Sequence, residues 1–300
     1  MIHARYVTPF LLMTLLLLTA CGQGDSNTPV QGAFLGGTQG VVTVFEPFGV
    51  EENGLQTIFD TEAFPIEVTL QNKGEYQVQP GEVKVQLLGP APEEFEGIPS
   101  RELMNAGVLD EISELVPEGG EETISFTSDA KFVEEVANFL DRDWFANIEY
   151  TYKTFVVVPE VCLKEDLTDT RVCDVREPKQ FFVSGAPITV TAVEEDTAGR
   201  GIMALKLTLR NAGTGKVTMP GLEFDDTRER LAFSIDDPAW ECKSAGKVNE
   251  ARLFNGEAEI VCKLKETLPQ DTLSTKQVKL TLDYKYRELI QEKLRVKQSN

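Results

Sequence analysis

Ile66-Glu67-Val68-Thr69-Leu70-Gln71-Asn72-Lys73-Gly74 is the stretch that best indicates how this chain folds. Apolar and polar side chains alternate along it, which is typical of a half-buried β-strand, and the strand runs into an Asn-x-Gly turn signal. Asn bonds readily to its own backbone and Gly accepts a positive φ, so we expect the chain to reverse there.

The same pattern returns 139 residues later, in Leu205-Lys206-Leu207-Thr208-Leu209-Arg210-Asn211-Ala212-Gly213. A second similarity, at an offset of 134 residues, joins Ile148-Glu149-Tyr150-Thr151-Tyr152-Lys153 to Leu282-Asp283-Tyr284-Lys285-Tyr286-Arg287. Two matches at nearly equal offsets predict an internal duplication of one β-domain. The duplication would make Asn72 equivalent to Asn211, and Tyr150 equivalent to Tyr284.

The rest of the chain has many strand patterns and few helical ones. Residues 100–115 are ambiguous, and residues 130–140 have apolar side chains at a helical spacing, so we expect one short helix at most. Together these patterns predict an all-β protein with two tandem immunoglobulin-like antiparallel β-sandwich domains, residues 41–184 and 185–300. Further strands are expected over residues 41–45, 82–87, 122–127 and 146–158.

The strand that ends in Asn-x-Gly resembles the early strand of CARDB and related immunoglobulin-like modules of archaeal and bacterial surface proteins. The resemblance extends over residues 41–183 and 186–297, with Gly185-Ala186-Pro187 between them. It implies an immunoglobulin-like fold in both halves and a role at the cell surface.

The N-terminus has the pattern of an export signal. Arg5 precedes an uncharged run over residues 6–20 that is too short to cross a bilayer. The run closes on Leu18-Thr19-Ala20-Cys21, which resembles the lipobox of prokaryotic lipoproteins. The resemblance implies that residues 1–20 are a signal peptide and that a lipid on Cys21 anchors the protein to the cell membrane, on its extracytoplasmic face. An ordinary signal peptide with a chance Cys is the alternative.

Residues 21–40 contain six glycines together with Ser, Asn, Thr and Pro, and predict a flexible tether. A coil of this length would span about 25 Å on average. Such a tether would hold the folded domains away from the membrane.

Four cysteines follow Cys21, and an even number in an exported chain predicts disulfides. Their spacing favours the local pairs Cys162–Cys173 and Cys242–Cys262, one in each predicted domain. Each bridge would contribute about 3 kcal/mol by loop entropy. A four-Cys zinc site is the alternative, but the closely spaced Cys pairs that such sites use are missing.

The charge is uneven along the chain. Residues 22–184 carry 31 acidic and 10 basic side chains, whereas residues 185–300 carry 18 of each. An acidic chain is an unlikely partner for nucleic acid, because phosphate binding needs a basic surface. The acidic half is either a solvated surface or a surface for cations or a basic partner.

Candidate catalytic groups are scarce. The single histidine, His3, lies in the predicted signal peptide, which excludes His-based catalytic and metal sites from the mature chain. Trp144 and Trp240 are expected to pack in the core. Adjacent carboxylates are numerous, but neighbours on a strand point to opposite faces. The pairs are Glu51-Glu52, Glu93-Glu94, Glu121-Glu122, Glu194-Glu195, Asp225-Asp226 and Asp236-Asp237.

An acidic loop, residues 165–170, lies between Cys162 and Cys173 and has oxygen ligands of the kind that Ca²⁺ prefers, although without EF-hand spacing. We therefore expect a non-catalytic protein without a cofactor. Its expected role is that of an adhesion, scaffold or envelope-interaction module with a protein or cell-envelope partner. The alternative is a ligand-binding or hydrolytic lipoprotein that uses clustered carboxylates, with or without calcium.

Overall fold

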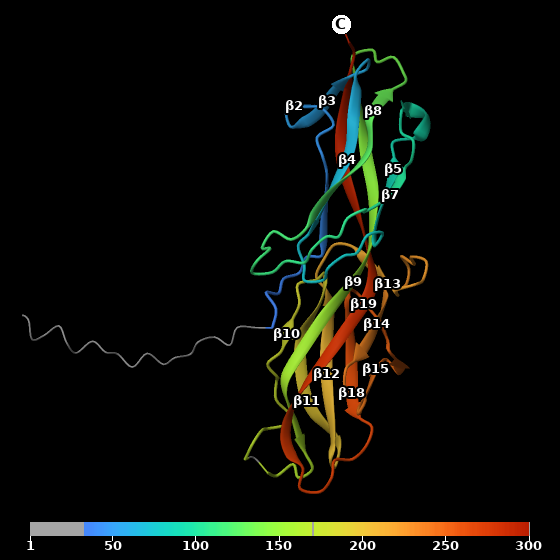
Figure 1. Ribbon diagram of the computed structural model, residues 1–300. Helices are drawn as coiled ribbons and strands as arrows, with labels where there is room; N and C mark the ends of the chain where they lie inside the picture. Colours follow the sequence, from blue (N-terminus) through green and yellow to red (C-terminus); the bar gives the residue numbers. More distant parts are fainter. Residues whose placement is uncertain (1–32, 170, 300) are drawn as a thin grey trace, which may run out of the picture. The chain divides into compact units, whose positions relative to one another are not determined.

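The computed structural model describes residues 33–169 and 171–299, and over these residues the protein is built almost entirely from β-strands (Figure 1). The described helical structure is a single 3₁₀ turn, η1 (Pro92–Glu94). The predicted all-β class is therefore confirmed. Residues 130–140, despite their helical spacing, end one strand and begin the next, because each strand end has a partner that supplies its backbone hydrogen bonds.

Two very long strands organise the molecule. β9 (Phe139–Lys164) has 26 residues and β19 (Leu273–Lys297) has 25. They pair antiparallel along their whole length, from Phe139 opposite Lys297 to Lys164 opposite Leu273. Figure 1 shows them side by side, with the other strands arranged around each end.

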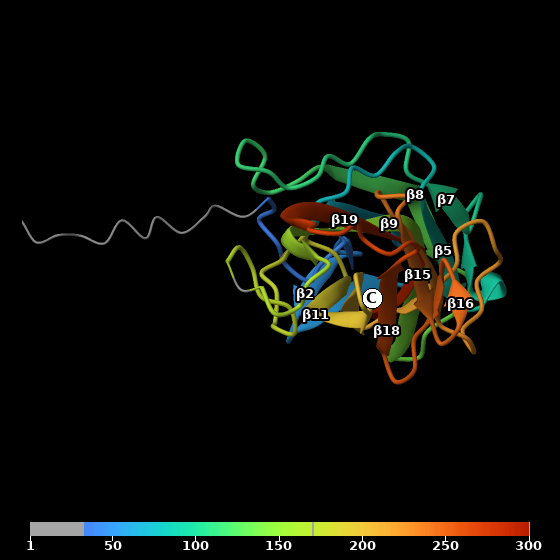
Figure 2. The same ribbon diagram turned by 90° about the horizontal axis from the view of Figure 1, so that it is seen from below.

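Two smaller sheets lie against this pair, one towards each end. The first, near the C-terminus, has the order β1 (Val41–Phe45), β4 (Ala63–Asn72), β8 (Glu121–Phe132), β6 (Phe95–Glu96). The second has the order β11 (Ile188–Gly199), β12 (Ile202–Asn211), β18 (Glu257–Leu264), β15 (Trp240–Ser244), β16 (Lys247–Val248). In Figure 2, seen from below, β11 and β18 form a layer separate from β9 and β19.

β9 and β19 lie at the centre of a third, ten-stranded sheet. Its main order is β17 (Glu250–Arg252), β14 (Arg230–Ile235), β19, β9, β5 (Val83–Gly89), β7 (Glu102–Met104). Four short strands join at its margins: β2 (Val50–Glu52), β3 (Leu55–Phe59), β10 (Phe182–Val183) and β13 (Lys216–Thr218). The pairing is antiparallel except where β3 runs parallel to the end of β19.

We call the four-stranded sheet and the part of the large sheet that faces it the first sandwich, and the five-stranded sheet with its facing part the second sandwich. The two sandwiches do not follow the domain boundary predicted between residues 184 and 185. The end of β9 belongs to the second sandwich, and the end of β19 returns to the first. A strand of 26 residues spans about 85 Å, far more than one sandwich needs, so the two sandwiches share both strands.

The end of the predicted tether is also part of the folded body. The Glu75 carboxylate accepts hydrogen bonds from the backbone N–H groups of Leu35 (2.8 Å), Gly36 (2.8 Å) and Gly185 (2.7 Å). The flexible segment predicted over residues 21–40 is thus wrong for residues 33–40, since these bonds tie it to the junction of the two sandwiches. Cys21 and the predicted signal peptide lie outside the described residues.

The two Asn-x-Gly turns share three hydrogen bonds. The amide of Asn72 donates to Tyr76 O (2.7 Å), and that of Asn211 donates to Gly215 O (2.8 Å). Each Oδ1 accepts from the backbone N–H two residues on, at 3.2 Å in both turns. Each Oδ1 also accepts from a tyrosine hydroxyl, Tyr152 at 2.9 Å and Tyr286 at 3.4 Å.

The glycines of these turns are needed for a different reason from the one expected. Neither Gly74 nor Gly213 has a positive φ. A Cβ on Gly74 would lie 2.1 Å from the Tyr152 hydroxyl, and one on Gly213 would lie 2.2 Å from the Tyr286 hydroxyl. Glycine is required at both positions because a tyrosine side chain packs directly against the backbone. The contacts that the two turns share support the predicted duplication.

Both predicted disulfides, Cys162–Cys173 and Cys242–Cys262, are confirmed. Their location differs from the expected one in each domain, because β9 carries Cys162 into the second sandwich. Both disulfides therefore lie in the second sandwich, and the first holds together without one. Trp144 and Trp240 are buried in the first and second sandwich respectively, as expected for core residues.

Candidate functional site

β9 and β19 pair antiparallel at the middle of the molecule, around Thr151 and Lys285, and we call this part of the pair the crossing. A local two-fold relation there exchanges the two strands. Tyr150 pairs with Tyr286, Tyr152 pairs with Tyr284, and Thr151 pairs with Lys285 at the centre. This register is symmetric under the 134-residue repeat: Thr151 lies opposite its own equivalent, Lys285, and the repeat turns the pair Tyr150–Tyr286 into the pair Tyr284–Tyr152.

One face of this crossing carries ion pairs. Glu149 contacts Lys285 (3.2 Å) and Arg287 (2.6 Å), and Lys153 contacts Asp283 (3.4 Å). Partial burial raises the pKa of Glu149, but the hydrogen bonds from Arg287 and Lys285 outweigh it and leave the pKa below its ordinary value. The charges on this face therefore satisfy one another.

The opposite face carries the four tyrosines, which are almost completely buried and in contact with one another. Ring centroids lie 5.7 Å apart for Tyr150 and Tyr152, and 5.5 Å apart for Tyr150 and Tyr286. Burial raises the pKa of Tyr286 to about 12 and holds that of Tyr150 well above its ordinary value, so both hydroxyls are protonated at neutral pH.

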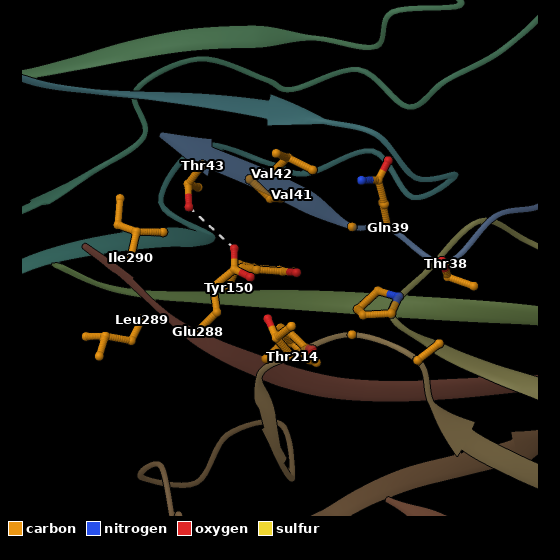
Figure 3. A pocket seen from close by; sticks show the side chains of 15 residues that line it. Thr38, Gln39, Val41, Val42, Thr43, Tyr150, Thr214, Glu288, Leu289 and Ile290 are labelled. Carbon is orange, nitrogen blue, oxygen red and sulfur yellow. Dashed lines mark hydrogen bonds between the residues drawn. The ribbon is translucent and has the colours of Figure 1, made fainter. Parts of the chain in front are cut away.

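A pocket of about 420 Å³ opens beside the tyrosines, at the junction of the two sandwiches. Its walls are residues 38–43, the turn around Gly213, and β19 from Tyr286 to Ile290. Figure 3 shows β1 along one side and the Glu288 side chain across from Thr43. Apolar side chains, including Val42 and Leu289, and polar groups share the lining.

Glu288 is the charged side chain of this pocket. It accepts a long hydrogen bond from the Thr43 hydroxyl (3.4 Å), and within the described residues it has no ion-pair partner (Figure 3). Burial raises the pKa of Glu288, and the hydrogen bond from Thr43 offsets this only in part. The pocket thus contains a half-buried carboxyl group without a counter-charge.

The Tyr150 hydroxyl faces the same pocket. It makes no hydrogen bond in the described part of the chain, although the residue is only 2% exposed. A Cβ on Gly40 would lie 2.8 Å from this hydroxyl, so glycine leaves room for it. A phenol without a hydrogen-bond partner and a carboxyl group without a counter-charge are suited to bind a hydrogen-bond donor that is not part of this chain.

The acidic pairs noted in the sequence do not form a common site. Their members point to different places and find separate partners, mostly cations or backbone N–H groups. Glu52 pairs with Lys297, Glu94 with Arg142, Glu195 with Lys179, Asp226 with Arg287 and Asp237 with Lys276, while Glu122 accepts from the backbone of Ala106 and Gly107.

The acidic loop between Cys162 and Cys173 has partners for its carboxylates, some within the loop and one, Arg200, outside it. The buried Lys164 ammonium lies within it and donates to the backbone carbonyls of Asp169 and Cys173, both at 2.9 Å. A calcium ion there would face this ammonium. The carboxylate contacts are Glu165 with Arg200, Asp166 with Thr168, and Asp169 with Arg171.

A second buried charge cluster joins this loop to β11. Glu195 accepts hydrogen bonds from the Cys162 N–H (3.1 Å) and contacts the Lys179 ammonium (2.9 Å). Burial raises the pKa of Glu195, and the bonds from Lys179 and Cys162 reduce the rise. The cluster has its own cation, so its role is to hold the disulfide loop against the second sandwich.

In the described residues, no three His, Cys, Asp or Glu side chains are grouped so that they could hold a metal ion. The same residues contain no helix with the length and apolar character needed to cross a membrane.

The sequence did not single out Glu288 or the Tyr150 hydroxyl as site residues; Tyr150 was noted only as a marker of the repeat. A signal was nevertheless present. When the repeat that pairs residues 148–153 with residues 282–287 is extended by one residue, Thr154 becomes equivalent to Glu288, so a charged residue replaces a small one.

Comparisons of the chain with protein-family models, curated proteins and solved structures found no match, so the resemblances to lipoproteins and to CARDB-like modules stay predictions.

Proposed function

We propose that this protein is a lipid-anchored, extracytoplasmic, non-catalytic binding module, which acts in adhesion or envelope interaction through the junction between its two sandwiches. The observation that carries the proposal is the junction pocket, where within the described residues Glu288 lacks a counter-charge and the Tyr150 hydroxyl lacks a hydrogen-bond partner. The lipobox-like segment that ends in Cys21 and the two disulfides support an exported, membrane-attached location.

The chemistry of the pocket favours binding over hydrolysis. Carboxylate-based glycoside hydrolysis uses two carboxyl groups about 5 to 10 Å apart on either side of the scissile bond. Within the part of the chain that the structure describes, one carboxyl group, that of Glu288, lines the junction pocket. The ordinary nucleophiles in it, Thr38, Thr43 and Thr214, have no histidine or lysine in the lining to activate them.

The shared strands suit a module that must present one rigid surface. Because β9 and β19 run through both sandwiches, the two sandwiches on either side of the junction pocket cannot separate without breaking their pairing. The chain also enters the folded body at this junction, through the bonds of Leu35 and Gly36 to Glu75. A rigid, tethered pocket loses little conformational entropy when a partner binds.

A site-specific crosslinking experiment tests the proposal. A photo-reactive amino acid replaces Thr214, which is exposed at the rim of the pocket, in the full-length protein expressed in its own cell envelope. The matched control carries the same group at Ser128, an exposed position on β8. We expect a discrete adduct from position 214 that is absent from position 128. The same adducts from both positions, or none from position 214, would contradict a junction binding site.

A further inference from the structure

The junction pocket has an internal counterpart in which the same position is closed. The two-fold relation between β9 and β19 exchanges Tyr150 with Tyr284 and Glu288 with Thr154. In the second sandwich, the Thr154 hydroxyl donates to Ile188 O at 2.6 Å and lies 3.0 Å from the Tyr284 hydroxyl. Thr154 and Tyr284 are both fully buried there, and their polar atoms satisfy one another.

The first sandwich differs from this arrangement at Glu288. Glu288 occupies the position equivalent to Thr154, and the Tyr150 hydroxyl lacks the partner that Tyr284 has. A pocket of about 420 Å³ lies beside these two residues in place of a closed contact. The second sandwich shows that this fold can close the position with a buried hydroxyl pair. The open pocket beside Glu288 and Tyr150 is therefore not required by the architecture.

The pocket needs a cation to complete it. Other charged residues near the crossing have opposite charges within reach, such as Glu149 with Arg287 and Lys153 with Asp283. Among the described residues, no lysine, arginine or histidine lines the pocket, whose ionisable groups are Glu288, Tyr150 and Tyr286. A half-buried carboxylate gains most from a charge-assisted hydrogen bond with a donor that brings the missing positive charge.

The lining also indicates the shape of that cation. One oxygen of Glu288 accepts a long hydrogen bond from Thr43, and within the described residues the other oxygen has no partner. An ammonium group is a compact donor of three hydrogen bonds, and it can use the free Glu288 oxygen and the Tyr150 hydroxyl oxygen together. Val42, Leu289 and Ile290 provide apolar surface that an aliphatic stem can cover.

We propose that the junction pocket binds a primary ammonium group on an aliphatic stem, of which the side chain of a partner's lysine is the form that a surface protein would meet. The ammonium lies between the Glu288 carboxylate and the Tyr150 hydroxyl, and the stem lies along Val42 and Leu289. This assignment rests on the proposed binding function and names the chemistry of its ligand.

Titration with lysine derivatives tests the assignment. The mature chain with Cys21→Ser, purified without lipid, is titrated by calorimetry with Nα-acetyl-lysine amide and with its Nε-acetylated form, which lacks the charge. We expect binding of the first probe, and binding at least about tenfold weaker for the acetylated probe, because the charge-assisted hydrogen bond is lost. Equal binding of the two probes, or none of the charged one, would overturn the assignment.

Variants locate the binding. Glu288→Thr installs the residue that the second sandwich has at this position, so the variant is expected to fold, and it should weaken binding of the charged probe at least about tenfold. Tyr150→Phe should weaken it several-fold. Glu292→Gln, which lies on the same face of β19 but outside the pocket, is the control and should bind as the unchanged chain does. Equal losses in Glu292→Gln and Glu288→Thr would place the binding elsewhere.

The two proposals can fail separately. If no lysine probe binds but the photo-reactive group at position 214 still gives its specific adduct, the ammonium assignment is wrong and the binding function stands. If neither result is obtained, both are wrong.

Discussion

Thr151 on β9 pairs with Lys285 on β19, and this pair lies at the centre of a local two-fold relation between the two halves of the chain. The tyrosines on either side of it, Tyr150 with Tyr286 and Tyr152 with Tyr284, bury one face of the crossing. The ion pairs of Glu149 and Lys153 cover the other. Each half of the chain thus supplies one long strand, β9 or β19, to both sandwiches.

Shared strands predict that the sandwiches unfold together. Replacing Cys242 and Cys262 by Ala should lower the free energy of unfolding by about 3 kcal/mol through the loop entropy of the second sandwich. The loss should also reach the first sandwich, because both contain β9 and β19. Fluorotryptophan labelling gives one ¹⁹F signal for Trp144 and one for Trp240, and we expect both to shift to the same lower urea midpoint. A Trp144 signal that keeps its original midpoint would show that the sandwiches are independent.

The glycine of the second turn should tolerate a methyl group once its tyrosine loses the hydroxyl. Gly213→Ala places a Cβ 2.2 Å from the Tyr286 hydroxyl, and its next contact is at 3.1 Å. We expect a loss of about 2 to 3 kcal/mol on urea unfolding. Most of this loss should disappear when Gly213→Ala is measured in a Tyr286→Phe background.

Gly74→Ala is the matched comparison in the first turn. Its Cβ would also meet the backbone oxygens of Gly185 at 2.5 Å and Gln39 at 2.6 Å. Tyr152→Phe should therefore rescue it poorly. Equal rescue in the two turns would argue against backbone packing at the junction.

The two repeated asparagines should differ in their contribution to stability. Asn72 is fully buried, and its amide also donates to Leu109 O at 3.1 Å, a bond that Asn211 lacks. Asn72→Ala leaves buried carbonyls and the Tyr152 hydroxyl unsatisfied and should cost about 3 kcal/mol, whereas Asn211→Ala should cost about 1 to 2 kcal/mol. Urea unfolding of the two variants checks the order, and a larger loss in Asn211→Ala would contradict it.

Glu288 and Glu149 should affect stability with opposite signs as pH changes. Burial raises the folded-state pKa of Glu288, so its ionisation opposes folding once the pH exceeds the ordinary carboxyl value of 4.5. Glu288→Gln should therefore be more stable than the unchanged chain at pH 7, and the gain should vanish as the pH falls below 4.5.

The pKa of Glu149 is lowered, so its ionised form stabilises the folded state above the ordinary value, and this contribution is lost as the pH falls. Glu149→Gln should be less stable at pH 7, with the difference shrinking towards acid pH. Thermal unfolding of both variants at several pH values measures the two trends. A loss of stability at pH 7 in both variants would show that Glu288 has a counter-charge after all.

Membrane attachment depends on Cys21 in the proposed function. When cells are extracted with detergent, the unchanged protein should partition into the detergent phase. Cys21→Ser should be released or remain unprocessed, because no thiol is available for lipidation. Phase separation followed by immunoblotting distinguishes the two outcomes. Equal partition of the variant into detergent would exclude a lipid on Cys21.

Several features of the fold follow from local sequence. Alternating side chains predicted β1, β4, β5, β8 and β12, since period-two burial is a property of each strand by itself. The local spacing of the cysteines predicted both disulfides, because chain segments of this length fold back within reach of a bridge. The repeated Asn-x-Gly and tyrosine patterns predicted the equivalence of Asn72 with Asn211.

Other features depend on contacts between residues far apart in the sequence, and only the tertiary structure decided them. The local sequence does not predict that β9 and β19 continue through both sandwiches, because the length of a strand is set by the partners that supply its backbone hydrogen bonds. That pairing moves Cys162 out of the first sandwich. It also brings Glu288 next to Tyr150 and Thr43, so a glutamate that is one of many in an acidic chain becomes a half-buried carboxyl group without a counter-charge.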